Sequence, residues 1–335
     1  MSASPKPKVA FIGTGGTISS LGIHPLEIQD YGVHENRMHA STILARYPEV
    51  SEIAEVIAVD FRNTPSPNVY FADWKELAAL CTSLVAKHPD LDGIVIGHGT
   101  ATLEETAYVL NLILKVPVPV VIVGSQRPAS GLSTDAGMNL LNAVRTAGHP
   151  DSRGRGVLVL LNDEIQAARE VTKTSNWRMQ TFRTPDFGIL GHADADCIAY
   201  YRKPERRHMP ETEFDLTEVE ALPRVDIAYA YAGADGAAVR AFIAAGAKGI
   251  VSAGFAPGSP PPGDLDALTE ATAQGIIVVQ SSRAGSGRIF RGKRLAEAGI
   301  VAGDNLNPQK ARLLLALALT RTSDPEEIAR IFLTY

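Results

Sequence analysis

Cysteine, long apolar runs and an excess of one charge are what this 335-residue sequence lacks. Its two cysteines, Cys81 and Cys197, exclude a disulfide framework; a single bridge is the alternative, but we expect reduced thiols in a cytoplasmic protein. The apolar runs are strand-sized or broken by charges, and the first residues offer no apolar core for a signal peptide, so neither a membrane span nor secretion is expected. With 32 Lys+Arg against 37 Asp+Glu, the net charge of -5 gives no electrostatic reason to expect a nucleic-acid partner.

The length of the chain exceeds what one ordinary hydrophobic core supports, so two domains are expected. Hydrophobic residues make up 45% and charged residues 21%, which is typical of globular proteins and argues against long disorder. The stretch 202–223, RKPERRHMPETEFDLTEVEALP, is charged and contains proline, as linkers often do. We therefore predict an N-terminal domain over 1–205, a linker over 206–222 and a C-terminal domain over 223–335.

Apolar, β-branched runs alternate with amphipathic stretches along the chain, which predicts an α/β fold. In the N-terminal domain, strands are expected at 9–13, 56–61, 93–97, 118–124 and 156–161, with helices at 74–87, 103–114 and 135–147. In the C-terminal domain, strands are expected at 225–230, 249–252 and 276–280, with helices at 235–245 and 264–274. We predict a larger N-terminal domain with an open, mixed or parallel sheet covered by helices on both faces, and a smaller C-terminal α/β domain with a parallel sheet.

Several polar residues stand where helices are expected to begin. Asn307 and Asp324 each precede a proline, which is the pattern of an N-cap followed by a proline in the first turn. Asp135 is expected to cap the helix that follows it, as Ser133 or Thr134 also could. Thr102 and Glu105 fit a capping box, a sufficient structural explanation for these two residues.

A glycine-rich turn, Gly-Thr-Gly-Gly-Thr at 13–17, follows the first predicted strand. It lacks the third glycine of a dinucleotide fingerprint, because Ile18 stands there. The stretch 287–294 comes close to a phosphate-binding loop, but Arg294 occupies the position of the magnesium-binding hydroxyl. Both nucleotide interpretations are therefore weak, and the glycines instead predict a tight turn that brings the backbone close to a ligand.

Hydroxyl groups and one lysine follow the ends of predicted strands. Thr14 and Thr17 come at the first strand, where the structural alternative is a turn or cap role. Thr100 follows the third strand and precedes a helix, whose N-terminus favours a developing negative charge. Lys173 lies between two threonines in Val-Thr-Lys-Thr (171–174); a lone lysine is usually solvated, but in a crowded polar cleft it can lose its proton and act as a base.

Five segments, in order and spanning nearly the whole chain, resemble the bacterial-type asparaginase/glutaminase family. They are TGGTIS at 14–19, HGTATLEETA at 98–107, GSQRPASGLSTDAGMNLLNAV at 124–144, VTKT at 171–174 and GDNLNPQKARLLLALALT at 303–320. The resemblance implies a two-domain amidohydrolase that acts on a small-molecule amide and uses neither a metal nor an organic cofactor. It also implies a homotetramer built from intimate dimers, with sites between subunits.

The resemblance assigns roles to individual residues. Thr17 corresponds to the nucleophile, Tyr31 to the lid tyrosine that assists it, Thr100 to the second threonine and Lys173 to the lysine. Ser66, eight residues before Trp74, corresponds to the serine that holds the substrate α-carboxylate. Backbone amides around Thr17 and Thr100 are expected to receive the oxyanion, and the remaining substrate-binding positions are Gly16, Gly99 and Ala101. Because a threonine hydroxyl is a poor nucleophile, Tyr31, or Lys173 acting through Thr100 or a water, is expected to take its proton.

The sequence departs from the family where the substrate ammonium would bind. The family's HGTDT reads HGTAT, so Ala101 replaces an aspartate that contacts the α-amino group and the lysine. Pro257 replaces an asparagine, and the stretch near 291–294 is basic where some members supply a glutamate from a neighbouring subunit. Leaving an ammonium without these partners would cost several kcal/mol. We therefore expect a substrate without a free α-ammonium, such as a half-amide of a dicarboxylic acid, an N-acylated amino acid amide, or a cyclic imide or lactam.

Other interpretations stay open at this point. One alternative is a conventional L-asparaginase, in which Ala101 is either a tolerated substitution or an engineered change that inactivates the enzyme. The other alternative is a non-catalytic homologue that binds a ligand. The stretch after Thr17 also holds His24, His34 and His39, but their spacing matches no standard zinc motif. One of these histidines, or Arg37, could close over a carboxylate; a solvent-exposed lid is slightly favoured.

Overall fold

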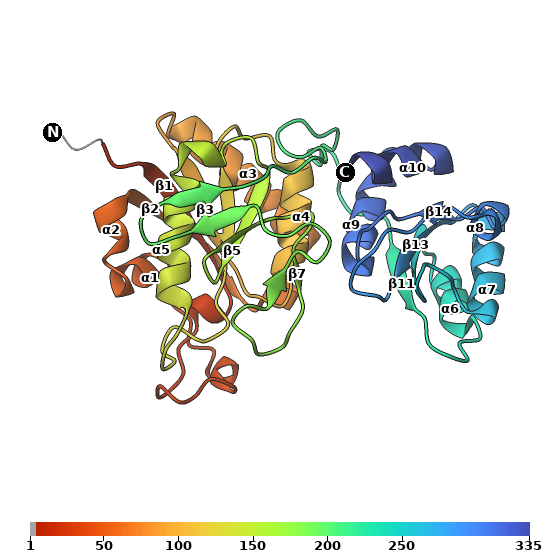
Figure 1. Cartoon of the computed structure of the whole chain (residues 1–335), viewed down its shortest axis with the longest axis horizontal. Helices are drawn as coiled ribbons and strands as arrows, with labels where there is room; N and C mark the ends of the chain where they lie inside the picture. Colours follow the sequence, from red (N-terminus) through yellow and green to blue (C-terminus); the bar gives the residue numbers. More distant parts are fainter. Residues whose placement is uncertain (1–4) are drawn as a thin grey trace. The chain divides into compact units, whose positions relative to one another are not determined.

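The computed structural model describes residues 5–335, which form two compact units (Figure 1). The first unit ends at Glu213 and the second runs from Phe214 to Tyr335. Each unit has its own sheet and its own apolar core.

An eight-stranded sheet forms the centre of the N-terminal unit, in the order β10-β9-β6-β5-β4-β3-β1-β2. Its strands are β1 (Lys8–Gly15), β2 (Glu55–Thr64), β3 (Gly93–Gly97), β4 (Val120–Val123), β5 (Val157–Leu161), β6 (Glu164–Ala167), β9 (Gly191–Ala193) and β10 (Ile198–Tyr200). The pairs from β2 to β5 are parallel, whereas β6, β9 and β10 continue the sheet antiparallel. The predicted open, mixed sheet is confirmed, and the antiparallel strands are an addition to the strands predicted from the sequence.

Helices cover this sheet on both faces (Figure 1). They are α1 (Ala40–Arg46), α2 (Val50–Ile53), α3 (Phe71–Lys87), α4 (Leu103–Ile113) and α5 (Ala136–Ala147). Val9 and Phe11 of β1 belong to an apolar cluster with residues of α1 and α5, while α3 and α4 pack on each other. Every residue of β3 is buried, which explains why its sequence is a continuous apolar run. This pattern is typical of a parallel strand that is covered on both faces of the sheet.

Two predicted helix caps are wrong. Thr102 stands at the N-cap of α4, but its hydroxyl donates to the carbonyl of Ser66 across 2.8 Å and makes no cap hydrogen bond. Asp135 stands at the N-cap of α5, but its carboxylate accepts from the backbone amides of Gln126 and Arg127. In both cases a neighbouring loop offers the side chain a partner, so the side chain ties that loop to the helix start.

The C-terminal unit has a four-stranded, wholly parallel sheet in the order β11-β12-β13-β14, as predicted. The strands are β11 (Val225–Tyr229), β12 (Gly249–Gly254), β13 (Ile277–Ser282) and β14 (Val301–Ala302). The helices are α6 (Ala237–Ala244), α7 (Pro262–Ala273), α8 (Lys293–Glu297), α9 (Pro308–Ala318) and α10 (Pro325–Thr334). The predicted caps are confirmed here, because Asn307 accepts from the amide of Lys310 and Asp324 from that of Glu326.

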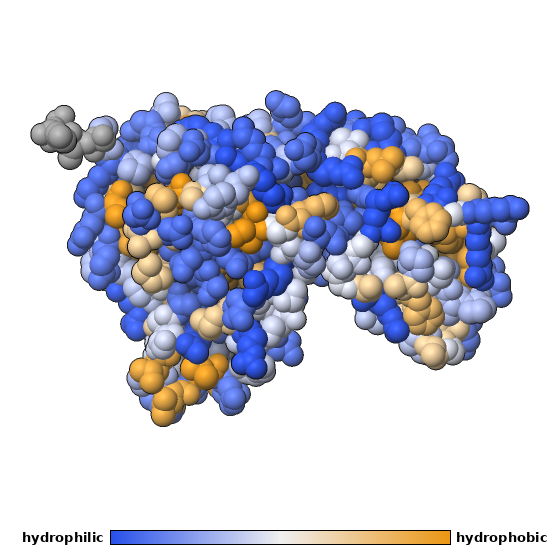
Figure 2. Space-filling view, viewed as in Figure 1, coloured by the Kyte–Doolittle hydropathy of each residue, from blue (hydrophilic) through white to orange (hydrophobic). Residues whose placement is uncertain are grey.

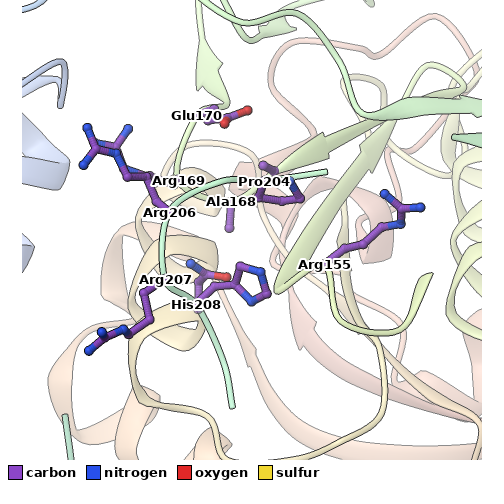
Figure 3. Close-up of a pocket in the computed structure, with 10 residues that line it drawn as sticks. Arg155, Ala168, Arg169, Glu170, Pro204, Arg206, Arg207 and His208 are labelled. Carbon is purple, nitrogen blue, oxygen red and sulfur yellow. The ribbon is translucent and has the colours of Figure 1, made fainter. Parts of the chain in front are cut away.

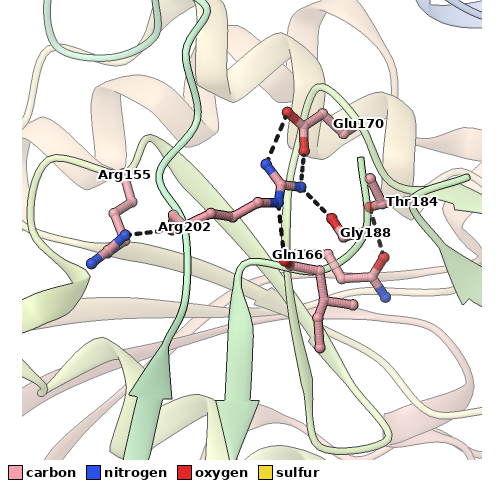
Figure 4. Close-up of polar contacts among 7 residues, drawn as sticks. Arg155, Gln166, Glu170, Thr184, Gly188 and Arg202 are labelled. Atoms are coloured by element: carbon pink, nitrogen blue, oxygen red, sulfur yellow. Dashed lines mark hydrogen bonds and ion pairs between the residues drawn. The ribbon is translucent and has the colours of Figure 1, made fainter. Parts of the chain in front are cut away.

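Arg202 anchors the last part of the N-terminal unit (Figure 4). Its guanidinium pairs with Glu170 at 2.5 Å and donates to the carbonyls of Gly188 and Ile189, while its own carbonyl accepts from Arg155. Glu170 lies close in sequence to Thr172 and Lys173, which form the short strand β7 (Thr172–Lys173). The contacts of Arg202 therefore fix the segment that presents Lys173.

Candidate active site

The predicted glycine turn brings the ends of two strands close together. Gly15 and Gly16 have φ angles of 108° and 80°, a region that side chains other than glycine rarely adopt. A Cβ atom on Gly16 would lie 2.2 Å from the Cα atom of Gly99, in the turn that follows β3. Glycine is therefore required at position 16 for both conformation and space, and the residues after β1 and β3 meet at the carboxyl edge of the sheet.

Thr17 and Tyr31 form a hydrogen-bonded pair beside this edge. Thr17 begins a short 3-10 turn, η1 (Thr17–Ser19), and its Oγ1 lies 2.9 Å from the hydroxyl of Tyr31. Tyr31 begins a second 3-10 turn, η2 (Tyr31–His34). Both side chains are half-buried, so the pair is held in place and remains open to solvent.

The segment that carries Tyr31, here named the lid segment (residues 20–39), exposes several apolar side chains. Ile23 is 74% exposed, and Leu26 and Val33 are each 72% exposed. Figure 2 shows apolar surface on the protrusion at its lower left, which the lid segment forms in the same view in Figure 1. Inside the segment, Glu27 accepts from the amide of Ile23 and pairs with the imidazole of His34 at 2.7 Å. His34 is thereby engaged within the lid segment.

Thr100 and Lys173 form a second pair. The Nζ atom of Lys173 donates to Oγ1 of Thr100 across 2.8 Å, and Thr100 donates in turn to the amide oxygen of Gln126 at 3.3 Å. Strand β7, which carries Lys173, pairs antiparallel with β8 (Phe182–Arg183). Burial lowers the pKa of Lys173 below its ordinary value, while the carboxylate of Glu104 acts in the opposite direction. The neutral amine is thus more populated than in a solvated lysine.

Ser66 lies on the same edge and is buried. It begins the 3-10 turn η3 (Ser66–Asn68), and a Cβ atom on Gly99 would lie 2.8 Å from its Oγ atom. The backbone at Gly99 therefore passes directly against the Ser66 side chain. Ala101, in contrast, is exposed. The predicted site residues thus lie in one region of the N-terminal unit. Some directly follow the ends of neighbouring strands, and the others belong to segments that contact those ends.

Sequence reasoning missed His98, which is fully buried next to the site. One ring nitrogen, Nδ1, donates to the carbonyl of Gly99, and Nε2 accepts from the hydroxyl of Thr106, which itself accepts from the indole of Trp74. Burial lowers the pKa of His98 to about 4, so the imidazole is neutral at pH 7. Its position directly after an apolar strand was the available signal.

A polar cavity, open to solvent and with a volume of about 520 Å³, lies beside Ala101. Its lining residues are Ala101, Glu104, Lys173, Thr174, Ser175 and Asn176. Glu104 is the one carboxylate among them, and it already accepts from the hydroxyl of Thr172 at 3.1 Å and the amide of Lys173 at 3.2 Å. Sequence reasoning treated this residue only as part of a motif.

A second, narrow pocket lies near the end of the N-terminal unit (Figure 3). Several arginines line it, but Arg155 and Arg207 point in opposite directions, away from its centre. The guanidinium of Arg155 instead stacks over the ring of Tyr200 at 3.9 Å. This cavity does not gather its positive charges around one point.

The structure places the two departures from the family that lie in the C-terminal unit. Pro257 stands in the loop that follows β12, where Phe255 is bridged to Ser259. Arg291, in the basic stretch, pairs with Glu326 of α10 at 2.8 Å.

Over residues 5–335 no cluster of three or more His, Cys, Asp or Glu is arranged to hold a metal ion. No helix in the same residues is long and apolar enough to span a bilayer.

Comparison with known proteins identifies the family. The model of the N-terminal asparaginase domain matches residues 8–206, and the model of the glutaminase/asparaginase C-terminal domain matches residues 224–332. The chain belongs to the asparaginase family. It is therefore a hydrolase that acts on carbon–nitrogen bonds other than peptide bonds, an asparaginase-type amidohydrolase.

Relatives in the asparaginase family cover almost the whole chain. L-asparaginase 2 of Bacillus subtilis is 40% identical over 98% of this chain and 87% of its own length. The glutaminase-asparaginase of Pseudomonas fluorescens is 39% identical over 98% of this chain and 90% of its own length. A crystal structure described as a probable cytoplasmic L-asparaginase from Campylobacter jejuni matches with a TM-score of 0.93 at 37% identity, over 98% of this chain and all of that one.

Proposed function

We propose that the protein hydrolyses a small amide through Thr17 as nucleophile, on a substrate that lacks a free α-ammonium group. The observation that carries the chemistry is the Thr17–Tyr31 contact of 2.9 Å beside the Thr100–Lys173 contact of 2.8 Å. Each pair combines a hydroxyl with a group that can move a proton, as activation of a threonine nucleophile requires.

The proposed reaction has two halves. In the first, Oγ1 of Thr17 attacks the amide carbon while Tyr31 takes the Thr17 proton and passes its own hydroxyl proton towards the leaving nitrogen, and backbone amides of the glycine turns bind the oxyanion. The C–N bond then breaks, and the protonated nitrogen departs as ammonia from a primary amide or stays on the opened chain of a cyclic imide or lactam. In the second, water attacks the acyl-enzyme and its proton returns to Thr17, which releases the acid. Lys173 assists through Thr100, because burial lowers its pKa and so favours the neutral amine, which can accept a proton.

Ala101 supports the proposed substrate class. A methyl group faces the position where an ammonium-binding carboxylate would stand, and the carboxylate lining the adjacent cavity, Glu104, is buried and committed to Thr172 and Lys173. The charge of an ammonium group bound here would lack a carboxylate partner to offset its loss of hydration, whereas a neutral substituent or a hydrogen atom needs no such partner. A half-amide of a dicarboxylic acid, an N-acylated amino acid amide, or a cyclic imide or lactam meets this condition.

Steady-state kinetics on matched substrates tests the substrate class. We expect kcat/KM for succinamic acid, the des-amino analogue of asparagine, or for N-acetyl-L-asparagine, to exceed that for L-asparagine and L-glutamine. A kcat/KM for L-asparagine equal to or above that for the best of the des-amino and N-acylated amides would refute the proposed substrate class. The Thr17→Val variant serves as the control in each assay.

Hydrolysis of L-asparagine or L-glutamine is the second candidate. It is favoured by the names of the relatives, which are L-asparaginases and glutaminase-asparaginases at about 40% identity. Under this candidate the ammonium is held by groups other than residue 101, so Ala101→Asp would leave the ranking of substrates unchanged.

The same proposal includes a cytoplasmic homotetramer with no membrane or nucleic-acid partner. Support for the location comes from the name of the Campylobacter jejuni neighbour, while another relative, from Haemophilus influenzae, is named as periplasmic. Cell fractionation and light scattering on the purified protein test the two parts separately. Recovery with periplasmic markers would contradict the location, and a monomeric mass would contradict the assembly.

A further inference from the structure

We infer that Glu104 is a positioning residue that aims Lys173 at Thr100 and places a negative charge close to the lysine. The inference deepens the proposed function, since it rests on Lys173 taking part in that reaction. It assigns a role to a residue that touches neither the Thr17 hydroxyl nor the substrate in the proposed mechanism.

The position of Glu104 explains how a buried carboxylate is tolerated. It stands in the first turn of α4, and only 5% of its surface is exposed. The free amide groups and the dipole at a helix N-terminus stabilise a negative charge in the first turn. The carboxylate is therefore available as a fixed, charged acceptor in the protein interior.

Two hydrogen bonds connect Glu104 to the segment that carries Lys173. Its Oε1 atom accepts from the hydroxyl of Thr172 at 3.1 Å and from the backbone amide of Lys173 at 3.2 Å. Strand β7 consists of these two residues alone, so its ladder with β8 is short, and the bonds to Glu104 add to the anchor that Arg202 provides at Glu170. With Glu104 in place, the side chain of Lys173 reaches Oγ1 of Thr100 at 2.8 Å.

Glu104 is also the charge that acts on the lysine. Burial lowers the pKa of Lys173, and the negative charge of Glu104 opposes that change. The other charged groups on neighbouring elements have partners of their own: Arg183 of β8 pairs with Glu164 at 3.3 Å, and Asp135 accepts from the amide of Gln126. Residue 101, the other side chain next to Thr100, is an alanine and contributes no charge.

Replacing Glu104 with glutamine separates charge from geometry. Glutamine keeps an oxygen that accepts the two hydrogen bonds, so the Glu104→Gln variant is expected to fold and to keep Lys173 in place while the negative charge is lost. The pKa of Lys173 should then fall. The matched control is Glu105→Gln, which removes a negative charge from the same helix turn one residue further along.

The direct measurement is the titration of the Lys173 side chain by NMR, with isotope-labelled lysine and a Lys173→Met variant to assign the signal. It is carried out in the Thr17→Val background, so that it does not depend on turnover. We expect the titration midpoint in Glu104→Gln to move to lower pH, and the midpoint in Glu105→Gln to match the parent. Equal midpoints in Glu104→Gln and the parent would overturn the electrostatic part of the inference.

Kinetics tests the positioning part in protein with Thr17 intact. Glu104→Ala should lower kcat about 10²-fold with little change in KM, because a displacement of about 1 Å at a reacting group has that effect. Glu104→Gln should recover most of kcat and shift the acidic limb of the pH profile to lower pH. Wild-type kcat in a folded Glu104→Ala variant would overturn the positioning role. If the wild type itself cleaves no amide, the proposed function fails, while the lysine titration still decides the inference.

Discussion

Lys173 and Thr100 lie 73 positions apart in the sequence, yet the lysine amine donates to the threonine hydroxyl across 2.8 Å. The contact joins a two-residue strand to the turn after β3, and no local pattern in either segment contains it. It places a lysine with a lowered pKa against a hydroxyl at the carboxyl edge of a parallel sheet. The predictions below follow from this contact and from those around it.

Removing the hydroxyl of Tyr31 should slow the reaction without altering the fold. Tyr31→Phe deletes the partner that lies 2.9 Å from the Thr17 hydroxyl, and loss of a positioned proton acceptor typically lowers kcat by about 10²- to 10⁴-fold. The half-exposed side chain contributes little to stability, so Tm should change little. Stopped-time ammonia assays together with calorimetry check this; a Tyr31→Phe variant with wild-type kcat would remove Tyr31 from the mechanism.

Restoring a carboxylate next to Thr100 should change the substrate preference. Ala101→Asp places a negative charge beside the polar cavity, where it can pair with an α-ammonium. A hydrogen bond between charged groups contributes about 1.5–3 kcal/mol, so kcat/KM for L-asparagine should rise roughly 10- to 100-fold relative to succinamic acid. Ala101→Asn is the matched control, since it has similar size and no charge. An equal gain in the two variants would argue against charge recognition.

Breaking the ion pair of Arg202 should destabilise the N-terminal unit. Arg202→Met leaves the Glu170 carboxylate, which is only 8% exposed, without its guanidinium. Loss of one partner from a buried pair costs 3–5 kcal/mol, and since Arg202 is partly exposed we expect about 2 kcal/mol. Denaturant unfolding measures this value. Arg240→Gln, which breaks an exposed pair with Glu270, should cost clearly less, because solvent screens an exposed pair. Equal losses in the two variants would show that burial of the pair is unimportant.

His98 should make the fold sensitive to acid. Burial lowers the pKa of His98 to about 4, against an ordinary value of 6.5. Between these two pH values the imidazole is protonated in the unfolded chain but neutral in the folded chain. The stability is therefore complete above pH 6.5 and falls as the pH drops towards 4, by about 3 kcal/mol from this group. His98→Gln does not titrate, so the wild type should lose more stability than the variant over this interval. Parallel pH dependences would contradict a neutral, buried His98.

Much of the site could be predicted because its signals are local. The turn at Gly15 and Gly16 follows from three glycines in four residues next to a strand, and the structure shows both the positive φ angles and the close approach to Gly99. Most of the parallel strands could be predicted for the same reason, since turn residues follow their apolar runs, whereas the two-residue parallel strand β14 was not predicted. The caps at Asn307 and Asp324 depend only on residues two or three positions away.

The missed features depend on contacts between distant segments. Thr102 fits a capping box by its spacing, but its hydroxyl donates a hydrogen bond to the carbonyl of Ser66, which lies 36 residues away in the sequence. The antiparallel strands β9 and β10 have three residues each, too few to show a period. The role inferred for Glu104 requires knowing that Thr172 and Lys173 lie beside the start of α4.

The central claim is that Thr17 is the nucleophile, and trapping of the acyl-enzyme tests it most directly. The protein is incubated with an acylating amide analogue that lacks an α-amino group, quenched in acid, digested and examined by mass spectrometry. We predict one added acyl group on the peptide that contains Thr17, absent from Thr17→Val and from protein unfolded before labelling. An acyl group located on another residue, or undiminished turnover of succinamic acid by Thr17→Val, would contradict the account.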